Sequence, residues 1–204
     1  MLNIIIKGGP VMIPIIIGSI FGFAIVIEKL LVLRKVSMDN YSFVQHIFRE
    51  LKNRKFQSAL TECEKNSNVP LATLFKIGIE RRALAPERLE KILEQAGNNQ
   101  IQKLEKRLGA FASIVSIEPL LGFLGTITGL IRAFMTWEKA GADITVSALS
   151  GGIYEAMITT AAGLIIAIPL YLFYNYFVAR ISSIAHELTG HSVQLIEMLS
   201  EVKE

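Results

Sequence analysis

The sequence predicts an all-α integral membrane protein with three transmembrane helices, the second and third of which extend into a long cytoplasmic helical bundle. Two observations lead to this fold class. The 204-residue chain is 51% hydrophobic and only 19% charged, with a mean hydropathy of +0.45, so it is more apolar than an ordinary soluble domain. The apolar residues also gather in three stretches, and a basic block separates the first stretch from the second.

Each apolar stretch is long enough to cross a membrane, because about 20 helical residues span roughly 30 Å of hydrocarbon. Residues 8–27 carry no charge, and we place the N-terminus and the first transmembrane helix within 1–34. The second helix is expected at 108–134, where Glu118 is the acid inside the apolar run. The third helix is expected at 149–179.

Lysine and arginine flank these stretches on one side, which the positive-inside rule assigns to the cytoplasm. Lys35 follows the first stretch, Arg107 precedes the second and Arg180 follows the third. We therefore expect two cytoplasmic segments, a helical region at 35–107 and a C-terminal helix at 180–204.

The opposite side of the membrane receives the N-terminus and the connection at 135–148, which is a periplasmic loop in this topology. The connection is short and contains Trp137, a residue type that favours the membrane interface. Lys7 and Arg132 count against this orientation, although their long side chains can reach the aqueous interface.

The cytoplasmic region is predicted to consist of helices. Their expected ranges are 41–53, 56–65 and 71–84, with a break at 66–70. Pro86 then starts a further helix from a first-turn position. Apolar residues continue at helical spacing beyond it, so we expect one continuous helix through the second transmembrane stretch, about 50 residues and roughly 75 Å long.

Glu155 is the one charged residue between Ile144 and Ala179. A carboxylate inside a transmembrane helix is costly unless it faces a polar cavity or a partner, so Glu155 is a candidate functional residue. The alternative is a structural acid that pairs across a subunit boundary and moves no proton.

The second stretch carries a polar stripe along one side of its helix. Its members are Glu118, Gly122, Gly125, Thr126 and Gly129. Gly125 and Gly129 form a Gly-x-x-x-Gly pair, which permits either close helix packing or backbone that faces water. Glu118 stands directly before Pro119 and is either a second proton-relay group or a residue of a water-filled vestibule.

The third stretch carries a matching stripe. Its members are Gly152, Glu155, Thr159 and Ala162 at spacings of three and four, with Thr160 adjacent. We expect the two stripes to meet in an aqueous pathway. The predicted proton-pathway or pore-lining residues are Thr126, Glu155, Thr160, Thr159 and Glu118, and the predicted helix-packing residues are Gly122, Gly125, Gly129, Gly152 and Gly163.

The sequence indicates neither an enzyme nor a cofactor. We expect no catalytic residues and no metal, because His186 and His191 are five residues apart rather than the four of a zinc-protease motif. The basic block is mixed with acids and lacks interleaved aromatic residues, which favours lipid headgroups over nucleic acid. Cys63 is the single cysteine and is expected to be a semi-buried helix residue.

Two segments resemble the MotA/TolQ/ExbB proton-channel family, most closely its ExbB and TolQ branch. They are 119–134, Pro-Leu-Leu-Gly-Phe-Leu-Gly-Thr-Ile-Thr-Gly-Leu-Ile-Arg-Ala-Phe, and 152–169, Gly-Ile-Tyr-Glu-Ala-Met-Ile-Thr-Thr-Ala-Ala-Gly-Leu-Ile-Ile-Ala-Ile-Pro. The remaining chain matches the family in layout. Glu118 departs from the family pattern, since relatives more often carry a small or apolar residue before the proline.

The resemblance implies an inner-membrane subunit that uses the proton motive force to energise outer-membrane processes. Its homopentamer would surround the transmembrane helices of a dimeric single-span partner of the ExbD or TolR type, whose aspartate carries protons. Thr126 and Thr160 would line the pore near that aspartate, and Glu155 would contribute to proton handling or subunit contact. A TonB- or TolA-like protein would transmit the force.

Alternatives from other classes stay open at this point. The chain could be a passive membrane scaffold in which Glu155 only locks subunits together, or a MotA-like flagellar stator subunit. A small solute transporter is less favoured, because three spans without inverted repeats offer no obvious substrate site.

Overall fold

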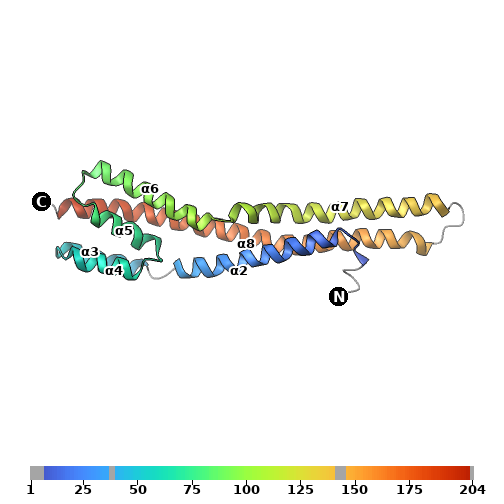
Figure 1. Cartoon of the computed structure of the whole chain (residues 1–204), viewed down its shortest axis with the longest axis horizontal. Helices are drawn as coiled ribbons and strands as arrows, with labels where there is room; N and C mark the ends of the chain where they lie inside the picture. The colour runs from blue at the N-terminus through green and yellow to red at the C-terminus, as the bar shows by residue number, and fades with distance from the viewer. Residues whose placement is uncertain (1–6, 37–39, 141–145, 203–204) are drawn as a thin grey trace. The chain divides into compact units, whose positions relative to one another are not determined.

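The computed structural model describes residues 7–36, 40–140 and 146–202, and within these ranges the chain forms helices and no strands. Figure 1 shows the helices labelled α2 to α8 in chain order. The all-α prediction is therefore confirmed. The N-terminal end and the centre of the predicted periplasmic loop lie outside the described residues.

The chain divides into two compact units, each built from segments distant in sequence. The first unit comprises Met1–Glu28 and Arg107–Tyr176, and the second comprises Lys29–Lys106 and Phe177–Glu204. Helices α2 and α8 contribute residues to both.

Three helical stretches are long and apolar enough to cross a membrane, as predicted. The first is α2, Met12–Val36. The second contains α7, Leu108–Ala140, which continues past the expected end at residue 134. The third lies in α8, Val146–Glu201, a single helix that joins the predicted third span and C-terminal helix without a break.

The prediction of one continuous helix from Pro86 through the second span is wrong. Helix α6, Pro86–Glu105, ends before α7 begins. Lys106 has extended backbone angles, φ −48° and ψ 130°, and Arg107 has a left-handed φ of 69°. A non-glycine residue seldom adopts that region, so the helix is interrupted here although no proline or glycine marks the position.

Contacts from α2 accompany this interruption. The buried Lys29 ammonium donates a hydrogen bond to the carbonyl of Leu104 at 2.5 Å, and so serves one of the last carbonyls of α6, which have no donor within their helix. The Arg107 guanidinium forms an ion pair with Glu28. Lys29 therefore binds the end of α6 within the second unit, and Glu28 binds Arg107 within the first unit.

The second unit contains the short helices that the sequence predicts. These are α3, Asn40–Lys52, α4, Phe56–Lys65, and α5, Pro70–Glu80, with α5 ending one turn earlier than expected. Their core centres on Phe75, which is fully buried and stacks with Phe43 and Phe48 at ring separations of 6.1 and 5.7 Å. His191 of α8 meets the same ring edge-on.

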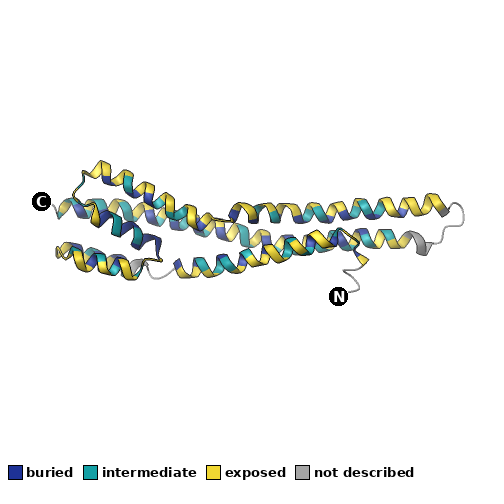
Figure 2. Ribbon diagram, viewed as in Figure 1, coloured by how far each residue is buried: buried dark blue, intermediate teal, exposed yellow. Residues whose placement is uncertain are grey.

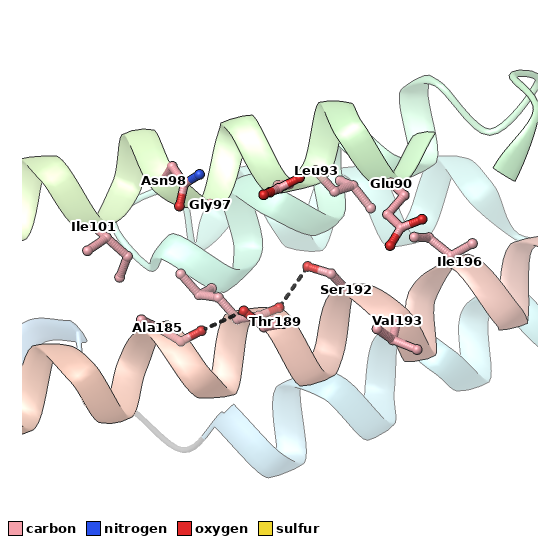
Figure 3. Close-up of a pocket in the computed structure, with 12 residues that line it drawn as sticks. Glu90, Leu93, Gly97, Asn98, Ile101, Ala185, Thr189, Ser192, Val193 and Ile196 are labelled. Carbon is pink, nitrogen blue, oxygen red and sulfur yellow. Dashed lines mark hydrogen bonds between the residues drawn. The ribbon is translucent and has the colours of Figure 1, made fainter. Parts of the chain in front are cut away.

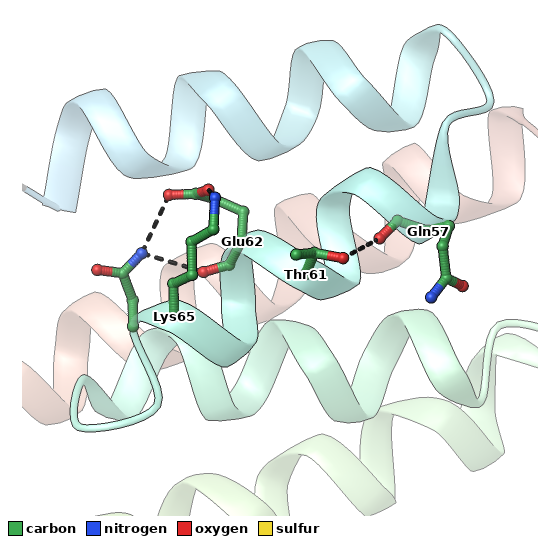
Figure 4. A network of polar contacts seen from close by, with 5 residues as sticks. Gln57, Thr61, Glu62 and Lys65 are labelled. Carbon is green, nitrogen blue, oxygen red and sulfur yellow. Dashed lines mark hydrogen bonds and ion pairs between the residues drawn. The ribbon is translucent and has the colours of Figure 1, made fainter.

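The end of α4 is held by side chains of its last turn (Figure 4). The Asn66 amide donates to the carbonyl of Glu62 at 3.0 Å and to its carboxylate at 3.2 Å. Lys65 pairs with the same carboxylate at 3.2 Å. The Asn66 side chain thus adds to its own backbone N–H, which also donates to the Glu62 carbonyl. The chain turns at the predicted break before Pro70 starts α5.

The first unit differs from the second in its surface, which is largely apolar. Its helices α2, α7 and α8 carry exposed stripes (Figure 2), and the exposed residues include many large apolar ones. Ile20, Phe123 and Ile165 are among these exposed residues. Glycines and threonines lie between the helices, together with buried apolar residues such as Phe111 and Leu170. This arrangement suits a lipid surrounding, because lipid tails solvate apolar side chains and small residues let helix backbones approach.

Candidate functional site

Helices α7 and α8 meet along a line of four glycines in the first unit, which we call the glycine seam: Gly122, Gly129, Gly152 and Gly163. A Cβ atom added to Gly129 would lie 2.7 Å from the carbonyl oxygen of Gly152, and the reverse distance is also 2.7 Å. A Cβ on Gly163 would lie 3.0 Å from the Cα of Gly122. Any larger residue would therefore force the two backbones apart.

Thr126 and Thr160 lie in the middle of this seam and hydrogen-bond to each other through their hydroxyl groups. The Thr160 hydroxyl also lies 3.0 Å from the carbonyl oxygen of Gly122, on the facing helix. Both threonines are half-buried. The structure therefore brings together two of the predicted pathway residues, and each keeps part of its surface accessible from outside the unit.

Thr159 occupies a different position from its neighbour Thr160. It is fully buried, and its hydroxyl donates to carbonyls of its own helix, at 3.1 Å to Glu155 and 3.0 Å to Ala156. A Cβ atom on Gly125 would overlap the Thr159 side chain, so the missing side chain of Gly125 makes room for it. Thr159 thus lies inside the contact between α7 and α8, packed against the backbone of Gly125.

Glu155 forms an ion pair with Arg132 of α7, at 2.6 Å between Oε1 and Nη1. The Glu155 side chain is 14% exposed and that of Arg132 is 48% exposed. The carboxylate is therefore largely desolvated and neutralised by a cation from the same chain. A bidentate-capable guanidinium that is always charged is well suited to hold such a carboxylate in place.

The segment before α2 packs against this ion pair. Gly9 has a left-handed φ of 69°, and a Cβ atom there would overlap the Glu155 carboxylate and approach Arg132. Lys7 lies over the ring of Tyr154, 5.4 Å from its centroid. Glycine is required here for two reasons, its backbone angle and the close approach of the carboxylate.

Arg132 is the functional candidate that the sequence analysis did not select. In the sequence it stands out only as a charge that counts against the predicted orientation. A signal was nevertheless present, since Arg132 closes the second apolar stretch and Glu155 stands near the start of the third. In an antiparallel helix hairpin, residues equally far from the connection face each other, as Thr126 and Thr160 do.

Glu118 is buried, with 1% of the residue exposed, and faces α2. A Cβ atom on Gly18 of α2 would overlap its Oε1 atom, while its backbone carbonyl lies 2.7 Å from the position of a Cβ on Gly163. Its Oε2 atom has no hydrogen-bond partner within the described part of the chain. Glu118 therefore lies where all three spanning helices come together.

The second unit carries a groove of about 380 Å³ between α6 and α8 (Figure 3). Glu90, Glu94 and Asn98 line it from α6, and Thr189 and Ser192 line it from α8. Both hydroxyls bond to carbonyls of their own helix, at 3.1 and 2.7 Å. Within the described ranges no three histidine, cysteine or acidic side chains are grouped to hold a metal ion.

Comparison with known proteins identifies the family. The model of the MotA/TolQ/ExbB proton channel family matches residues 66–189, which include the glycine seam and the Arg132–Glu155 pair. The chain belongs to this family. The resemblance inferred from the two sequence segments is thereby confirmed, and the chain is a multi-pass membrane protein of a proton-channel family.

Individual relatives come from the ExbB and TolQ branch. The chain is 28% identical to the putative biopolymer transport protein ExbB-like 3 of Synechocystis over 171 residues, 83% of this chain and 81% of the relative. It is 27% identical to the Tol-Pal system protein TolQ of Haemophilus influenzae over 197 residues, 87% and 82% of the two chains. A putative ExbB homolog of Methanothermobacter thermautotrophicus is 28% identical over 86% of this chain and 62% of its own length.

Proposed function

We propose that this chain is a proton-channel and motor subunit of the bacterial inner membrane, which uses the proton motive force to energise TonB-dependent import or a Tol-Pal type process. The observation that carries the proposal is the hydrogen-bonded pair Thr126–Thr160, set in the contact of α7 and α8 within the family-matched region. The Arg132–Glu155 ion pair lies along the same two helices.

The chemistry of these groups supports a proton pathway. A hydroxyl can accept one hydrogen bond while it donates another, so two linked threonines provide a short chain along which a proton can be exchanged with water or with a carboxyl group. Thr126 and Thr160 are half-buried, which leaves them accessible to a further helix. Glu155 contributes a fixed charge on the same hairpin.

The family relationship supports the rest of the assembly. We propose a homopentamer around a dimer of a single-span ExbD- or TolR-like protein, whose aspartate is the main proton carrier, and a TonB- or TolA-like protein that receives the force. In the proposed topology the N-terminus and the loop at 135–148 are periplasmic, and 35–107 and 180–204 are cytoplasmic.

The scaffold alternative assigns Glu155 to a contact between subunits. Glu155 already has a cation partner in its own chain at 2.6 Å, so it needs no neighbouring subunit to be neutralised. This observation favours the channel over the scaffold.

Proton uptake into liposomes that contain the chain and its single-span partner tests the proposal. We expect the double variant Thr126→Val and Thr160→Val to slow uptake by about tenfold or more, which corresponds to ~1.4 kcal/mol of barrier. The matched control is Thr128→Val, since Thr128 is half-buried in the same helix but bonds only to its own helix, at 3.1 Å to the carbonyl of Gly125. Uptake at the wild-type rate in the double variant would refute the pathway.

Native mass spectrometry of Glu155→Gln separates the channel from the scaffold. The channel proposal expects an intact oligomer with impaired proton uptake. A dissociated oligomer would instead support a role of Glu155 in holding subunits together.

A further inference from the structure

Glu118 is the one acidic residue of the described chain that combines nearly complete burial with an oxygen atom lacking any hydrogen-bond partner. Its Oε1 atom lies against the backbone of Gly18, where the absence of a side chain makes the space it fills. The carboxyl group is therefore enclosed between α7 and α2 rather than directed at the Thr126–Thr160 pair.

No charged group on the surrounding helices is close enough to pair with Glu118. Along α7 the nearest charges are Arg107 and Arg132, about 16 and 21 Å away at 1.5 Å per residue. On α2 the nearest charge to Gly18 is Glu28, about 15 Å away.

Helix α8 offers no partner either. Measured from Gly163, which faces the backbone of Glu118, the nearest titratable residues are Glu155 and Tyr171, each about 12 Å along the helix. The three helices packed around Glu118 thus provide neither a cation nor an amide or hydroxyl donor to its Oε2 atom within the described residues.

An ionised carboxylate is not compatible with such an enclosure. Burying an isolated charge away from water costs far more than burying a neutral acid, and a buried group without a partner becomes neutral instead. We propose that Glu118 is a proton-binding site of the subunit, which holds a proton while α2 packs on α7 and releases it to water only when water enters between these helices. Release transfers one proton from the carboxyl group to that water and leaves a hydrated carboxylate.

The local sequence suits a neutral acid. Pro119 has no backbone N–H, so the carbonyl of Val115, one turn earlier, lacks its helical donor. A protonated carboxyl group has one O–H to donate, and a carboxylate has none. The proton-binding site is separate from the pathway proposed above, because the Glu118 carboxyl group lies against Gly18 of α2 and not against the Thr126–Thr160 pair.

Infrared spectroscopy of the full chain in lipid nanodiscs tests this proposal, since a protonated carboxyl group absorbs apart from carboxylates. At pH 7 we expect a protonated-carboxyl band in the wild type that Glu118→Gln removes. The matched control Glu155→Gln removes an acid of the same unit that already has a cation partner, Arg132, and should leave the band in place. A wild-type spectrum without such a band, or a band that persists in Glu118→Gln, would overturn the proposal.

A second variant probes the contact with α2 and does not require Glu118→Gln to fold. Gly18→Ala adds a methyl group at the position of the Glu118 carboxyl group, so we expect the band to shift or disappear. Gly109→Ala is the control, because a Cβ atom there meets nothing within 4 Å. An unchanged band in Gly18→Ala would show that the protonated group does not lie against α2.

Discussion

The interiors of the two units of this chain differ in the residues that fill them. In the second unit, aromatic and branched side chains such as Phe75 and Leu93 fill the core, and charged residues cover the surface. In the first unit, glycine, threonine and a buried acid lie between the helices beside buried apolar residues such as Phe111, and many large apolar residues such as Ile165 face outward. The difference shows that two forces hold one chain together.

The second unit relies on the hydrophobic effect, which removes apolar surface from water. The first unit cannot use that force between its helices, because lipid is as apolar as leucine, so close backbone contact and interhelical hydrogen bonds must stabilise it. Substitutions that remove volume should therefore harm the second unit, and substitutions that add volume should harm the first.

The largest effect is expected for Phe75→Ala. Phe75 is fully buried, so the substitution leaves a cavity and should lower the free energy of unfolding by about 3–5 kcal/mol. Guanidinium unfolding in detergent micelles, followed by circular dichroism, measures this loss. Phe134→Ala is the control, since Phe134 is 58% exposed, and an equal loss in both variants would contradict the comparison.

A smaller loss is expected when volume is added to the glycine seam. A Cβ on Gly152 would lie 2.7 Å from the carbonyl of Gly129, so Gly152→Ala should cost about 1–3 kcal/mol. The neighbouring Gly151 has open space, and Gly151→Ala should be neutral or stabilise the helix by up to ~1 kcal/mol. If both variants unfold alike under the same conditions, close backbone contact does not stabilise this unit.

The pH dependence of stability tests how well the core of the second unit excludes water at Cys63. Burial raises the pKa of its thiol to about 12 from 9.0, with the nearby Glu62 adding to the effect. The unfolded thiol ionises above pH 9 while the folded one stays neutral, so the stability difference between wild type and Cys63→Ala should be constant below pH 9 and shrink as pH rises towards 12. A difference that does not change between pH 8 and 11 would contradict this burial.

The smallest effect is expected at the surface of the second unit. Lys76 pairs with Glu64 at 2.8 Å, and this hydrogen bond raises the pKa of Lys76. The pair is exposed, and such pairs contribute little because water and salt screen them. Lys76→Gln should therefore have the same midpoint of guanidinium unfolding as the wild type. A clear shift of that midpoint would show that Lys76 stabilises the fold by more than an exposed ion pair does.

Much of the helix pattern is local and could be predicted. The starts of α4, α5 and α6 follow from helical periodicity and from Pro70 and Pro86, and the three spans follow from hydropathy alone. The interruption before Arg107 could not be predicted in this way. It is accompanied by contacts with Glu28 and Lys29, which are 79 and 75 residues from their partners, and no local breaker announces it.

The sequence predicts which residues belong to the candidate site, but it does not predict which of them contact each other. Spacing placed Thr126 and the glycines on one stripe, and the structure brings this stripe against Thr160. Spacing could not tell that Arg132 would neutralise Glu155 or that Glu118 would face α2, because both depend on how three helices are rotated against each other.

The glycine seam also limits how this gene can change. Every single-nucleotide substitution in a glycine codon that alters the residue introduces a side chain with a Cβ atom. At Gly122, Gly129, Gly152 and Gly163 each such mutant must displace a facing backbone, whereas Gly109, Gly151 and Gly190 have free space. A saturation-mutagenesis library selected for function should therefore be depleted at the first four codons and diverse at the other three.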